Sequence, residues 1–163
     1  MTKSLKHMGR RTGAVLVSLL LLLTLAVSAS AAAVKMTVGV RFWRESGDKE
    51  SMADSAVDTT REATLTRQPN GTFTLELPVK QLSSMNMTGS LTGIAIGEVN
   101  YDGTLSGDLS DGTAVLTLKN LPASVLTGSD SSKALAVTCS IRMDTILLGD
   151  IATSAKMSIW VER

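Results

Sequence analysis

Residues 63–79 read ATLTRQPNGTFTLELPV, and this stretch carries the clearest fold signal in the chain. Apolar residues alternate with polar ones on both sides of a turn sequence, which is typical of two half-buried strands joined as a hairpin. The first strand begins at Ala63, and the second runs from Phe73 to Val79. Between them, Asn70 and Gly71 predict a type I′ turn, because both residues tolerate positive φ values.

The same alternation recurs along the chain on both sides of this hairpin. Further strands are predicted at residues 36–42, 91–96, 99–105, 114–118, 135–141 and 157–161. Short clusters of Gly, Asp, Ser and Asn separate these strands, and only Glu50–Val57 favours a helical turn, which Ser51 or Asp48 would cap. This rhythm predicts an all-β protein, an immunoglobulin-like antiparallel β-sandwich of seven or eight strands with one short helical turn.

Residues 1–33 are predicted to be a secretory signal peptide. Lys3, Lys6, Arg10 and Arg11 supply a positive start, and an apolar run from residue 14 to residue 27 follows. Two small-residue cleavage sites come next, in residues 29–33. We therefore expect a secreted domain of residues 34–163, released or associated with the cell surface, with no transmembrane anchor.

The expected mature domain lacks the groups that many functions require. His7, the only histidine, falls in the signal peptide, so the commonest general base and metal ligand is missing. The remaining twelve basic and fifteen acidic residues give a formal net charge of −3, without a basic cluster for nucleic acid. Cys139 is the only cysteine and is expected to be a buried, inert thiol. We expect a binding module that is not an enzyme.

Two further sets of residues have competing interpretations. Trp43 and Trp160 fall on the faces opposite the apolar sets of their strands, so they are either exposed on a binding surface or covered by a loop. Asp108 and Asp111 lie in a Gly-rich stretch, but their spacing fits turns better than a calcium loop.

The segment Lys49-Glu50-Ser51-Met52-Ala53-Asp54-Ser55-Ala56-Val57, together with the strand layout, resembles the NEAT (near-transporter) domain of Gram-positive bacteria. These domains are immunoglobulin-like, and many bind haem for iron acquisition. The resemblance implies that Ser51 and Met52 form one lip of a haem groove, and that the strands at 135–141 and 151–161 form the other wall. It also implies haem, or a host or surface haemoprotein, as the partner.

In such a groove, the apolar ring and the carboxylates of haem need different contacts, which Met52 and Ser51 could supply. A methionine such as Met52 packs on the apolar ring, and burial of that ring is favourable by about 25 cal/mol per Å². The Ser51 hydroxyl could donate a hydrogen bond to a haem carboxylate near the free N–H groups of the helical turn.

The ligand positions depart from the family pattern. Haem-binding members carry Tyr-x-x-x-Tyr on the last strand, and those positions fall here on Ile151 and Ala155, on the same face as Met157. Met157 is therefore either ordinary core or a weak axial ligand. The candidate haem-contacting residues are Ser51, Met52, Ile151, Ala155 and Met157. The alternative function is protein recognition on the same scaffold without haem.

Overall fold

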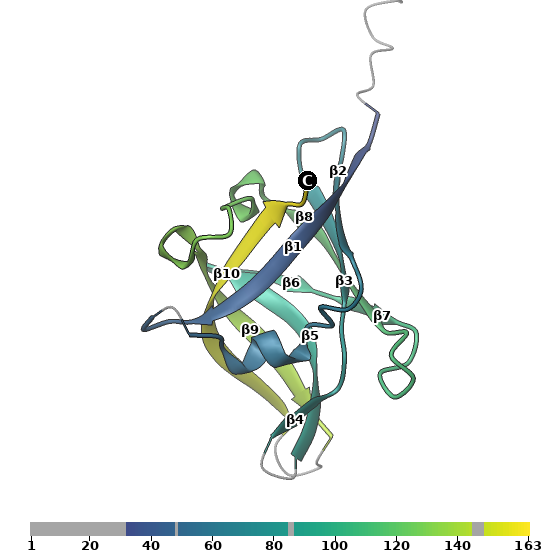
Figure 1. Ribbon diagram of the computed structural model, residues 1–163, viewed down its shortest axis with the longest axis vertical. Helices are drawn as coiled ribbons and strands as arrows, with labels where there is room; N and C mark the ends of the chain where they lie inside the picture. The colour runs from purple at the N-terminus through teal and green to yellow at the C-terminus, as the bar shows by residue number, and fades with distance from the viewer. Residues whose placement is uncertain (1–31, 48, 85–86, 145–148) are drawn as a thin grey trace, which may run out of the picture. The chain divides into compact units, whose positions relative to one another are not determined.

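Strands dominate the computed structural model, which describes residues 32–47, 49–84, 87–144 and 149–163 (Figure 1). The capping candidate Asp48 and residues 1–31 of the expected signal peptide lie outside the described residues. The elements in chain order are β1 (Val34–Arg44), η1 (Met52–Ala56), β2 (Ala63–Arg67), β3 (Phe73–Pro78), β4 (Leu82–Ser84), β5 (Met87–Ile96), β6 (Val99–Asp102), β7 (Thr104–Ser106), β8 (Val115–Leu121), η2 (Ala123–Val125), η3 (Ser131–Lys133), β9 (Leu135–Met143) and β10 (Asp150–Val161). Among the described residues, no helix is long and apolar enough to cross a membrane.

One antiparallel sheet contains all ten strands, in the order β4-β5-β9-β10-β1-β2-β3-β8-β7, with β6 also paired to β5. β1 belongs to two halves of this sheet, because Val34–Val38 pairs with β2 and Val38–Arg44 pairs with β10. On the other side, β6 pairs with β5 and β7 with β8, and only Gly103 separates β6 from β7. The sheet therefore curls until its halves face each other across the core (Figure 1).

The described residues form ten strands, where the sequence predicts seven or eight. β4 has only three residues, too few to show an alternating pattern. The strand expected at 99–105 divides at Gly103, where the chain passes from one half of the sheet to the other. A Cβ atom at Gly103 would collide with the Leu116 side chain and lie 2.8 Å from the Thr92 carbonyl oxygen, so this crossing requires glycine.

The core lies between the two halves and consists of the apolar faces that the alternation predicts. Phe42, Leu75, Leu77 and Leu116 have no exposed surface. Cys139 is also fully buried, and this burial raises the pKa of its thiol to about 12, as expected for an inert cysteine.

The β2–β3 hairpin is present, but its turn is not type I′. Gly71 donates from its N–H to the Gln68 carbonyl (3.0 Å), and Gly71 alone in the turn has a positive φ, of +84°. Pro69 holds its own φ near −65°, which suits the second position of a type I turn over residues 68–71. Asn70 therefore keeps a negative φ, and Gly71 takes the left-handed position that follows such a turn.

Trp43 and Trp160 lie half-buried on the outward faces of β1 and β10. Trp43 donates from Nε1 to Ser158 Oγ (2.9 Å), and the Arg41 guanidinium lies 5.5 Å from the centre of its ring. The Trp160 indole packs directly on Gly39, its partner across the β1–β10 ladder.

Replacing Gly39 with alanine should lower the free energy of unfolding by about 1–3 kcal/mol, because the added methyl group would occupy the space of the Trp160 ring. Urea denaturation followed by tryptophan fluorescence measures this loss. Gly47→Ala is the matched control, since nothing lies within 4 Å of its Cβ position. Equal stability of the two variants would contradict the packing described for Trp160.

Candidate functional site

The helical turn expected within Glu50–Val57 is η1, which begins after Ser51. Ser51 occupies the N-cap position, but its side chain makes no capping hydrogen bond, and its Oγ is buried without a partner. Ala53 and Ala56 are fully buried, and their small side chains let η1 pack closely against β1, β4 and β5. Met52 points the other way, with 53% of its surface exposed.

Asp54 ties η1 to β1. Its Oδ1 accepts a hydrogen bond from the Phe42 N–H (2.7 Å), and the Phe42 carbonyl accepts one from the Ser51 N–H (2.9 Å). Burial raises the pKa of the Asp54 carboxyl above its ordinary value, and the bond from Phe42 only partly offsets this effect. Both ends of the Ser51–Asp54 segment are thus fixed to one residue of the core strand.

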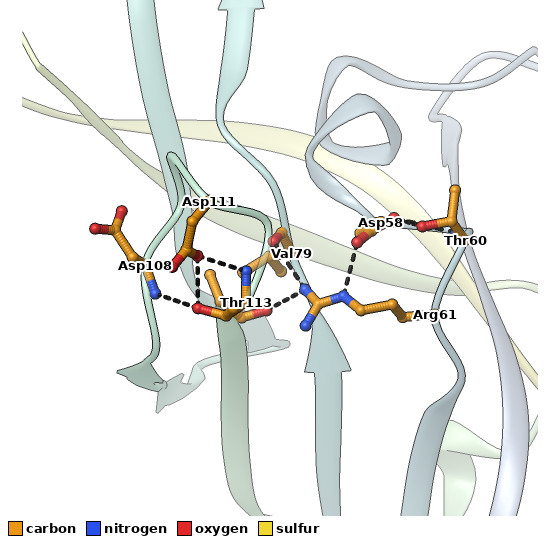
Figure 2. A network of polar contacts seen from close by, with 8 residues as sticks. Asp58, Thr60, Arg61, Val79, Asp108, Asp111 and Thr113 are labelled. Atoms are coloured by element: carbon orange, nitrogen blue, oxygen red, sulfur yellow. Dashed lines mark hydrogen bonds and ion pairs between the residues drawn. The ribbon is translucent and has the colours of Figure 1, made fainter.

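A second polar network fixes the loop that follows η1 (Figure 2). Arg61 donates from Nε to Asp58 Oδ2 (2.7 Å) and from Nη2 to the carbonyl oxygens of Val79 (3.4 Å) and Ala114 (2.5 Å). The Asp58 Oδ1 atom accepts from the N–H and hydroxyl of Thr60 (3.1 and 2.6 Å). One guanidinium therefore joins this loop to the residues after β3 and before β8.

The neighbouring Asp108 and Asp111 act in turns, as their spacing predicts. Asp111 Oδ1 accepts from the N–H and hydroxyl of Thr113 (2.9 and 2.6 Å), and Asp108 Oδ1 accepts from Ser110 in the same way (2.8 and 2.7 Å). In the described part of the chain, no group of three or more His, Cys, Asp or Glu residues is arranged to hold a metal ion.

Acid should weaken the network around Asp58. Hydrogen bonds from Thr60 and then from Arg61 lower the pKa of the Asp58 carboxyl from 3.8 to about 2. The unfolded chain therefore binds a proton more readily between these values. The stabilisation, about 1–2 kcal/mol, is complete above about pH 5 and is lost as the pH falls through 3.8 towards 2. We expect Asp58→Asn to reduce the slope of stability against pH in this window, in urea titrations.

The residues predicted on the last strand lie in two different environments. Ala155 and Met157 are 1% and 0% exposed, whereas Ile151 is 37% exposed. The difference arises because β1 is too short to cover all of β10. The last residue of β1, Arg44, pairs with Ala155, so the residues of β10 before Ala155 have no β1 neighbour. Met157 is therefore a core residue paired with Phe42. Of the three predicted residues on β10, Ile151 has the accessible side chain.

The same difference in length leaves part of β10 as an open edge. Asp150–Ser154 pairs with β9 on one side but has no β1 partner on the other. The Glu162 N–H donates to the Thr37 carbonyl (3.0 Å), so even-numbered residues of β10 direct their main-chain groups towards β1. The main-chain groups of Ala152 and Ser154 therefore face this open edge.

Phe42 lies between two of the predicted site residues, Ser51 and Met157. It pairs with Met157 on one side and bonds to Ser51 on the other, so η1 and β10 flank the same residue of β1. A pocket of about 560 Å³, lined mainly by residues of β5 to β10, includes Ile151 but not Ser51 or Met52. A second pocket, of about 230 Å³, lies where β1 leaves β2, beside Trp160 and Arg61.

A haem group makes two separate demands on these residues. The exposed Met52 and Ile151 suit an apolar ring, and the unpartnered Ser51 hydroxyl suits a ring carboxylate. The iron requires a donor atom, but the side chains of Ile151 and Ala155, which the sequence resemblance predicts at the tyrosine positions of the NEAT pattern, contain only carbon and hydrogen. The residues present therefore fit the ring and not the metal.

Sequence reasoning missed the residues that position η1, namely Asp54, Asp58 and Arg61. Asp54 follows Ser51 by three residues, a spacing that usually indicates local capping, whereas here the carboxylate bonds to a distant strand. Arg61 has no sequence signal, because its carbonyl acceptors are 18 and 53 residues away along the chain.

Comparison with known proteins bears on the fold. The sequence matches no family model and no curated protein. Among solved structures, the chain is similar to a mutant of IsdX2-NEAT5 in complex with heme, with a TM-score of 0.50 and 10% identity over 80% of this chain and 97% of that one.

That neighbour is a NEAT domain. The likeness shows that this chain has an all-β, immunoglobulin-like fold of the NEAT kind. In this NEAT-like fold, η1 follows the first strand and β9–β10 forms the last hairpin, which is the order that the sequence resemblance implies.

Proposed function

We propose that this chain is a secreted or surface-associated, non-enzymatic module that binds haem or a related porphyrin for iron acquisition. The observation that carries this proposal is the exposure of two large apolar side chains, Met52 at 53% and Ile151 at 37%, on η1 and on the last hairpin. Five other large apolar side chains of the described residues are exposed to a similar degree, so the proposal also depends on the positions of Met52 and Ile151, where the sequence resemblance predicts the two walls of the groove. The likeness to a domain solved with heme supports the same ligand class.

Titration of the purified protein with hemin, followed by visible absorbance in oxidised and reduced forms, tests the proposal. A saturable one-to-one change is expected. Met52→Asp should weaken it about 10-fold or more, since a charge placed against an apolar ring loses about 1.4 kcal/mol or more. Val99→Asp is the matched control, because Val99 is 54% exposed but lies on β6. A flat titration from a folded protein would contradict the proposal.

Protein recognition without haem is the second candidate function. It is favoured by the open edge of β10, where the main-chain groups of Ala152 and Ser154 have no partner strand. An extended segment of another protein could pair there as an added strand. Ala152→Pro removes one of these N–H groups and should abolish such binding, in pull-downs with candidate surface proteins, while leaving the folded state, followed by circular dichroism, intact.

A further inference from the structure

We propose that the site recognises the porphyrin ring and not its metal, so that iron-free protoporphyrin and ferric haem bind with equal affinity. This inference rests on the proposed function. It follows from the chain's histidine, tyrosine, cysteine and methionine residues, which carry the nitrogen, oxygen and sulfur ligands usual for haem iron. A ring held by apolar contacts alone gains the same burial energy whether or not it carries a metal.

The strong nitrogen and oxygen ligands are absent from the site. His7 is the only histidine and lies in the expected signal peptide. Tyr101 is the only tyrosine, and it lies on β6, paired with Ile94 of β5. Because β5 and β9 stand between β6 and β10, Tyr101 is about 14 Å from the last strand across the sheet. Its side chain packs partly buried against the core.

The sulfur ligands are mostly enclosed. Cys139 and Met157 have no exposed surface, and Met143 is 8% exposed. Burial also keeps the Cys139 thiol protonated, because it raises the pKa to about 12, and a protonated thiol is a poor ligand. Met36 packs partly buried against the core, on the part of β1 that pairs with β2. Met85 and the side chain of Met87 lie outside the described residues.

Met52 is therefore the exposed sulfur among the side chains that the structure describes at this site. Its thioether is neutral and soft, so it adds little to the binding of ferric iron. Its flexible chain packs against an apolar ring as well without a metal as with one. The same side chain that supports porphyrin binding gives no preference for ferric haem.

The test compares hemin, protoporphyrin IX and zinc protoporphyrin, titrated into the purified protein by quenching of Trp43 and Trp160 fluorescence. The three dissociation constants are expected to agree within about threefold, because the three compounds make the same apolar contacts with the protein. The spectrum of bound hemin should show no histidine, phenolate or thioether ligation. Met52→Leu, which keeps the apolar volume and removes the sulfur, should leave the ratio of the constants unchanged.

Two results would overturn the inference, and they are distinguishable. Tighter binding of hemin than of protoporphyrin IX by 10-fold or more would show metal ligation and would leave the proposed function standing. Loss of that advantage in Met52→Leu would then identify the ligand. If none of the three compounds binds to the folded protein, the proposed function fails and this inference fails with it.

Discussion

Replacing Phe42 with alanine is expected to lower the free energy of unfolding by about 3–5 kcal/mol, a large fraction of the stability of a domain of this size. Phe42 is fully buried near the C-terminal end of β1, where its ring packs in the core and its main chain pairs with Met157. Removing the ring leaves a cavity between the two halves of the sheet. Chemical denaturation measures the loss, and Phe42→Leu, which retains most of the volume, should cost less than half as much.

The same variant also tests how β1 positions the site. The Phe42 main chain holds both Ser51 and Asp54, so relaxation of β1 into the cavity would shift η1 and the exposed Met52. We expect Phe42→Ala to weaken porphyrin binding more than Leu75→Ala does. Leu75→Ala also creates a cavity in the core, but Leu75 belongs to β3 and does not hold η1. Equal binding by these two variants would show that η1 keeps its position without β1.

The alternation of apolar residues predicts most of the fold, because burial on one face of a strand is a local property. The alternation does not predict local structure that depends on residues far away in the sequence or on a neighbouring ring. The division at Gly103 depends on Leu116, which belongs to another strand, and the turn at Gln68–Gly71 depends on the ring of Pro69 and not on the Asn-Gly pair alone.

The candidate site shows the same limit. The sequence predicts Ile151, Ala155 and Met157 on one face of the last strand, and their spacing agrees with the register of β10. It does not predict that this face changes from exposed to buried along its length, because the change depends on where β1 ends against β10. Ile151 and Met157 share a face but lie in different environments.

Ile151→Tyr should convert a site without a metal ligand into one that ligates ferric haem. The sequence resemblance predicts that Ile151 occupies the first tyrosine position of the haem-binding pattern. Its side chain is 37% exposed, so a phenol ring can be placed there without overfilling the core. A phenolate is a strong ligand for ferric iron. Hemin should bind about 10- to 100-fold more tightly, which corresponds to about 1.4–2.8 kcal/mol.

The control variants separate ligation from added ring contact. Ile151→Phe supplies the same ring without the oxygen, so it should leave the hemin affinity within about threefold of the parent chain. Ala152→Tyr places a phenol on the opposite face of β10 and should also have no effect. Only Ile151→Tyr should add a phenolate-to-iron absorption band, and its affinity for protoporphyrin IX should not rise. If Tyr and Phe at position 151 behave alike, the ring does not lie over this part of β10. Ala155 cannot serve for the same test, because its 1% exposure leaves no room for a tyrosine in the core.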